Sequence, residues 1–146
     1  MGYGLLLMVH LLAAIAFVGT VFFEVLMLSA VRRHLPSELM RTVEGALGSR
    51  AVCVMPWVLL ALYAAGIGLA WHYRGVLSAP LASGLGTLLF LKILLALSVL
   101  GHFFTAMFWR RRGLLNGSRS RRLHLSVFAH VLVIVLLAKA MFYFAW

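Results

Sequence analysis

The chain has 146 residues, of which 64% are hydrophobic and 11% are charged, and its formal net charge is +10. A soluble domain is nearer half apolar and a quarter charged, so this composition excludes a water-soluble globule. The arginines cluster between apolar runs rather than along one face, which argues against nucleic acid as a partner and for membrane lipids.

Four apolar runs have the roughly 20 residues needed to cross a bilayer core about 30 Å thick. Glycine, proline and charge clusters limit these runs to residues 3–31, 51–73, 85–109 and 123–146. Ser37 follows Pro36 and predicts the N-cap of a short amphipathic helix over residues 37–48, lying on the membrane surface. We therefore expect one all-α transmembrane domain, an up-and-down four-helix bundle.

The arginines predict how this bundle is oriented. Two loops, between the first and second runs and between the third and fourth, hold nearly all of them, whereas the opposite side has only Arg74. The positive-inside rule places both basic loops in the cytoplasm and both termini outside, as in a bacterial-type inner (plasma) membrane. The basic loops carry Arg32, Arg33, Arg41, Arg50, Arg110, Arg111, Arg112, Arg119, Arg121 and Arg122.

With this orientation, a rise of about 1.5 Å per residue converts positions into depths. His102 and His130, on the third and fourth runs, both fall about 24 Å below the outer surface, whereas His10 and Lys92 fall roughly 10 Å below it. Paired imidazoles inside a helical bundle commonly hold b-type haem, one on each side of the iron. The matched depths therefore predict His102 and His130 as axial ligands, with His10 as a further candidate.

Other roles for these residues stay open. Each histidine could instead form only a hydrogen bond to a neighbouring helix, and Lys92 could either reach the outer interface or bind a haem propionate or an anionic substrate. Consecutive runs are adjacent in an up-and-down bundle, and haem fits better across a diagonal. A pairing of His102 with His130 would then need splayed helices, another packing order or a homodimer.

Two segments resemble known families. VHLLAAIAFVGTVFFEVLML resembles the first span of small CopD-like membrane proteins, in which a histidine precedes a WVGG-type turn and an FF pair. FLKILLALSVLGHFF is similar to their third span and to that of HemJ-type protoporphyrinogen oxidases. His10 and Lys92 are the matching positions, whereas Phe17 and Thr20 depart from the CopD-like pattern and a HemJ-like Trp-x-Lys lead-in is absent.

The resemblance implies either haem b and electron transfer or copper handling. The first hypothesis is a haem-b membrane protein, an electron carrier or oxidoreductase that exchanges electrons with a quinol or a redox partner protein. The second is copper binding or copper transport through His10 with methionines or Glu24, although the methionines do not cluster by depth. The third is HemJ-like oxidation of protoporphyrinogen.

Overall fold

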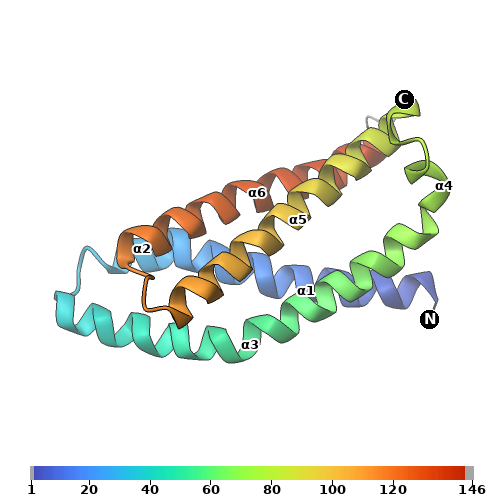
Figure 1. The fold of residues 1–146 in the computed structure, drawn as a ribbon. Helices are drawn as coiled ribbons and strands as arrows, with labels where there is room; N and C mark the ends of the chain where they lie inside the picture. Colours follow the sequence, from blue (N-terminus) through green and yellow to red (C-terminus); the bar gives the residue numbers. More distant parts are fainter. Residues whose placement is uncertain (1, 144–146) are drawn as a thin grey trace. The chain divides into compact units, whose positions relative to one another are not determined.

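The computed structural model describes residues 2–143, and within that range every regular element is helical. The expected all-α fold is confirmed, and four helical stretches are long and apolar enough to cross a membrane, as a four-helix membrane bundle requires. These stretches are Tyr3–Val31, Ser37–His72, Gly84–Arg111 and Gly117–Tyr143 (Figure 1). The predicted end of the fourth run, Trp146, lies outside the described residues.

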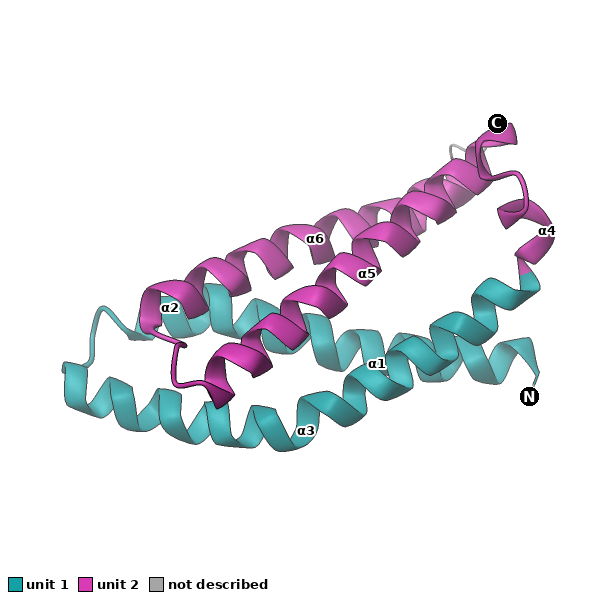
Figure 2. Ribbon diagram, in the orientation of Figure 1, with its two compact units in different colours: residues 1–72 teal, residues 73–146 magenta. Residues whose placement is uncertain are grey.

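The chain divides into two compact units, residues 1–72 and 73–146, and each contains two long antiparallel helices (Figure 2). In unit 1, α1 (Tyr3–Phe22), the π-helical segment η1 (Phe23–Leu28) and α2 (Ser29–Val31) follow one another as a single apolar stretch. This stretch has the limits predicted for the first span. It packs against α3 (Ser37–His72), and its buried residues Ala13, Phe17 and Val21 recur every four residues along α1.

The second helix of unit 1 differs from its prediction. We expected a surface helix over residues 37–48 and a separate span from residue 51, but α3 runs without a break from Ser37 to His72. The intervening residues, LGSRAV, include no proline, and a single glycine inside a helix costs only about 1 kcal/mol. The amphipathic segment and the span are therefore one helix.

Unit 2 begins with two short helical turns, α4 (Arg74–Leu77) and η2 (Pro80–Ala82), which contact the start of α5 (Gly84–Arg111). The Ser83 hydroxyl caps α5 by accepting a hydrogen bond from the Gly86 amide at 3.1 Å. At the other end, Gly113 has a positive φ of 65° and stops the helix. The third span thus matches its prediction within two residues at each end.

The last helix, α6 (Gly117–Tyr143), begins six residues before the predicted limit of residue 123. Its first turn is fixed by Asn116, whose Oδ1 atom accepts a hydrogen bond from the Arg119 amide at 2.9 Å. Arg119, Arg121 and Arg122 therefore lie on the helix and not in a loop. The loop predicted between the third and fourth spans was too long, because its end had been placed after the last arginine of the charged run.

Large apolar side chains are exposed on all four long helices, for example Leu12 at 69%, Leu60 at 60%, Phe104 at 61% and Leu136 at 68%. A monomeric soluble protein rarely exposes apolar surface on this scale. Lipid contact accounts for these faces, because exposing apolar side chains is unfavourable in water and is not unfavourable in hydrocarbon.

Candidate functional site

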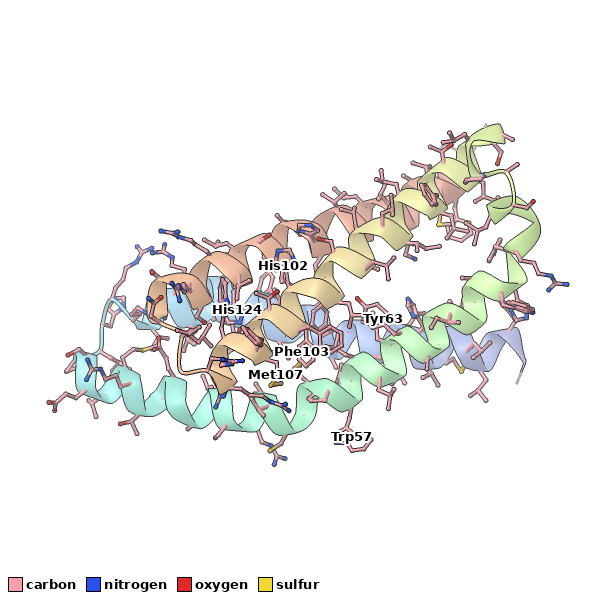
Figure 3. The ribbon with its side chains drawn as sticks, in the orientation of Figure 1. Trp57, Tyr63, His102, Phe103, Met107 and His124 are labelled. Carbon is pink, nitrogen blue, oxygen red and sulfur yellow. The ribbon has the colours of Figure 1, made fainter. Side chains whose placement is uncertain are left out.

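His102 on α5 and His130 on α6 meet in unit 2, as their matched depths predicted. Their ring centroids are 5.2 Å apart and the ring planes are inclined by 56°. Figure 3 shows the His102 side chain between the α5 and α6 ribbons. Both residues are half-buried, in the middle of helices that are otherwise apolar.

Two serines complete this cluster, which we call the histidine–serine clasp: Ser98, His102, Ser126 and His130. Ser98 Oγ lies 3.1 Å from His130 Nε2, and Ser126 Oγ lies 2.9 Å from His102 Nε2. Each Nδ1 atom lies 2.7 Å from a carbonyl of its own helix, His102 from Ser98 and His130 from Ser126. Each serine therefore binds both histidines, one through its carbonyl and the other through its hydroxyl.

These contacts assign the tautomer that each ring adopts when it is neutral. A carbonyl oxygen can only accept, so each Nδ1 atom carries a proton and donates it. In a neutral imidazole the Nε2 atom is then the acceptor, and it receives the hydrogen bond of the serine hydroxyl on the opposite helix. Both rings consequently present a basic Nε2 atom, with the ring orientation held by the Nδ1–H bond.

The imidazole nitrogens of the clasp are suitable ligands for haem iron. The space between the two rings, however, is too small for a haem. Histidines that bind metals usually donate the other ring N–H to a carbonyl or carboxylate, as both Nδ1 atoms do here. A macrocycle between the two rings, however, would have to part α5 from α6, which pack against each other, and would break both serine contacts. In this helix pairing, only one of the two Nε2 atoms can serve as a ligand, in place of its serine.

Ser98 and Ser126 were not predicted as part of the site, although the sequence carries a signal for them. The segments SVLGH (residues 98–102) and SVFAH (residues 126–130) share a serine four residues before the histidine and a small residue just before it. Residues four apart lie on one helical face, so this spacing places hydroxyl and imidazole side by side. Two such segments on antiparallel helices can bind each other reciprocally.

His10 belongs to unit 1 and connects α1 to α3. Its Nδ1 atom is 3.0 Å from the Leu62 carbonyl oxygen, so this nitrogen also donates. Gly66 makes room for the ring, because a Cβ atom there would lie 3.2 Å from His10 Cε1. His10 thus has the interhelical hydrogen bond that was the alternative to a cofactor role.

Lys92 is half-buried on α5, ten residues before His102, which is about 15 Å along the helix axis. The structure does not bring it to the clasp. Its predicted roles, reaching the outer interface or binding a haem propionate or an anionic substrate, stay predictions. Among residues 2–143, no group of three or more His, Cys, Asp and Glu side chains is placed to hold a metal ion. The copper hypothesis, which also draws on methionines, is not tested by this observation.

No protein-family model, curated protein or solved structure matches this chain. The resemblance to CopD-like and HemJ-type proteins therefore stays a prediction.

Proposed function

We propose that this multi-pass membrane protein binds b-type haem through the histidine–serine clasp and transfers electrons between membrane-associated partners, with a quinol as donor. The observation that supports the proposal is the Nδ1 contact of His102 and of His130 with a carbonyl of its own helix, which holds each ring so that its Nε2 atom could serve as an axial ligand. Such nitrogens are the usual axial ligands of haem iron. One-electron chemistry would be supplied by the haem.

The chain's own residues would contribute ligation and environment. His102 or His130 would provide the axial Nε2 atom while its Nδ1–H bond to the i−4 carbonyl keeps the ring in place. The serine displaced from that Nε2 atom can turn its hydroxyl to a carbonyl of its own helix, as Thr105 does toward Gly101 at 2.8 Å. The apolar helices would exclude water from the site.

The location that goes with this function is a bacterial-type inner membrane, with both termini outside and the basic ends of the helices in the cytoplasm. The distribution of arginine supports this orientation. A homodimer would be compatible with the proposal, since a second copy could offer the second axial ligand that the clasp cannot supply.

Absorption spectroscopy of detergent-purified protein, expressed with ample haem, tests the proposal. We expect a Soret band that shifts on reduction and is lost in the double variant His102→Ala/His130→Ala. His34→Ala is the matched control, because His34 is exposed and its Nδ1 atom bonds only to a local carbonyl. Colourless protein, or a band that survives in the double variant, would overturn the assignment.

Copper handling through His10 and HemJ-like oxidation of protoporphyrinogen remain the alternative hypotheses from the sequence. Metal analysis of the same preparation distinguishes the first, since stoichiometric copper without haem would favour it. Complementation of cells that lack their own protoporphyrinogen oxidase addresses the second.

A further inference from the structure

A cleft of about 310 Å³ lies at the loop end of the α5–α6 pair. Its volume is at the lower end of the range for small-molecule sites. Trp109 and Leu123 contribute apolar walls, and the clasp residues His102 and Ser126 also line it. The remaining two lining residues, Arg119 and Arg122, give the cleft its charge. We call this site the arginine cleft.

The two arginines lie three residues apart on α6, so they project to the same side of the helix. The Arg119 guanidinium is held in position, because its Nη1 atom donates to the Leu114 carbonyl at 2.9 Å and its Cζ atom is 5.4 Å from the centre of the Trp109 ring. A guanidinium has five N–H donors, and the bond to Leu114 uses one of them. Donors are thus available for a ligand at a fixed place.

Unit 2 has no acidic side chain that could neutralise these cations. The chain has three acidic residues, Glu24, Glu38 and Glu44, and all of them precede residue 73. Glu44 is moreover paired with Arg32 inside unit 1. Within unit 2, Arg119 and Arg122 therefore have no acidic side chain as a counter-charge, and an anionic ligand would provide one.

The setting indicates which anion this is. Arg119 and Arg122 stand at the basic end of two helices that have the length and composition of membrane spans. Trp109 is an amphipathic aromatic residue of the type that favours the level of lipid headgroups. Guanidinium groups match the geometry of phosphate oxygens, and basic pockets between transmembrane helices bind anionic headgroups.

We propose that the arginine cleft binds the phosphoryl headgroup of an anionic phospholipid, with Arg119 and Arg122 as its cationic ligands and Trp109 as an apolar wall. The acyl chains would follow the exposed apolar faces of α5 and α6. The two cationic ligands lie outside the histidine–serine clasp, although His102 and Ser126 belong to the clasp and also line the cleft.

Native mass spectrometry of the full chain, with phosphatidylglycerol added to detergent-purified protein, tests the proposal. We expect one retained lipid, and an apparent affinity that falls about fivefold on Arg119→Gln and about fivefold on Arg122→Gln, the effect of removing one cation close to a phosphate. Arg121→Gln is the matched control. Arg121→Gln removes the same charge at a position between the other two, but Arg121 does not line the cleft. The affinity of this variant for phosphatidylglycerol should therefore stay within about twofold of that of the unsubstituted protein.

Four results would overturn the proposal. Equal losses of lipid affinity in all three variants would indicate general surface electrostatics. Unchanged affinity in all three would place the lipid elsewhere. Retention of phosphatidylcholine as strongly as phosphatidylglycerol would show that the anionic headgroup is not recognised. The last result concerns competition by inorganic phosphate. If phosphate displaces the lipid at millimolar concentration and itself stays bound, the site takes the free anion instead.

Discussion

Ser98 and Ser126 are the residues that make the contact between α5 and α6 specific. Each bonds to the histidine of its own helix with a carbonyl and to the histidine of the other with a hydroxyl. In hydrocarbon an imidazole nitrogen without such a partner is costly, because no water is present to replace it. The clasp satisfies both nitrogens of both rings, so two polar side chains are tolerated inside apolar helices.

Ser126→Ala should destabilise the protein by about 0.6 kcal/mol, and by no more than about 1.7 kcal/mol, because it removes one interhelical hydrogen bond and leaves His102 Nε2 without its partner. Ser98→Ala should have a similar effect through His130. Equilibrium unfolding in mixed detergent micelles measures both. Ser29→Ala is the control, because that hydroxyl bonds only to Leu26 of the same stretch of helix. A clasp variant no less stable than this control would contradict the role given to the serines.

At the scale of elements, α1 and α3 owe their close approach to small residues opposite large ones. Gly66 and Gly68 of α3 face His10 and Leu6 of α1, respectively. A Cβ atom at position 68 would meet the flexible end of Leu6, whereas one at position 66 would meet an imidazole already bonded to Leu62. Gly66 is therefore the less replaceable of the two.

Gly66→Ala should destabilise the α1–α3 pair by about 1 kcal/mol, because the added methyl group pushes His10 away from the Leu62 carbonyl. Gly45→Ala, on the same helix, has no atom within 4 Å of its new Cβ and should be neutral or stabilising by up to about 1 kcal/mol. The same unfolding measurement compares them. If Gly66→Ala is as stable as Gly45→Ala, then His10 does not hold α1 against α3.

Helix limits were predictable where a capping residue or a breaker was present, and less so elsewhere. The first span ends before the RRHLP segment and the third begins after Ser83, and both predictions hold within two residues. The break predicted within α3, between residues 48 and 51, and the start of α6 were misjudged because charge was among the signals taken to mark a boundary. Arginine has a good helix propensity, so a run of arginines does not by itself end a helix.

At the scale of the whole molecule, the exposed apolar faces require a membrane, and the arginines predict its sidedness. In a Cys53→Ser background, a cysteine at position 37 or 118 should resist a membrane-impermeant maleimide in intact bacterial spheroplasts, whereas one at position 78 should react. Permeabilised cells provide the control, since all three thiols should then react. Labelling of position 118 in intact spheroplasts would reverse the orientation and move the arginine cleft to the outer leaflet.

Sequence alone determined the membrane class, the four spans and the matched level of His102 and His130, because composition and the rise per residue are local properties of a helix. It did not reveal what the imidazoles bind. That depends on how α5 and α6 are rotated about their axes. Where a helix is apolar on all sides, its sequence has no hydrophobic periodicity from which the packing face could be predicted. The tertiary structure decided it by bringing Ser98 and Ser126 to the two rings, because hydrogen bonds that water cannot replace favour that rotation over its alternatives.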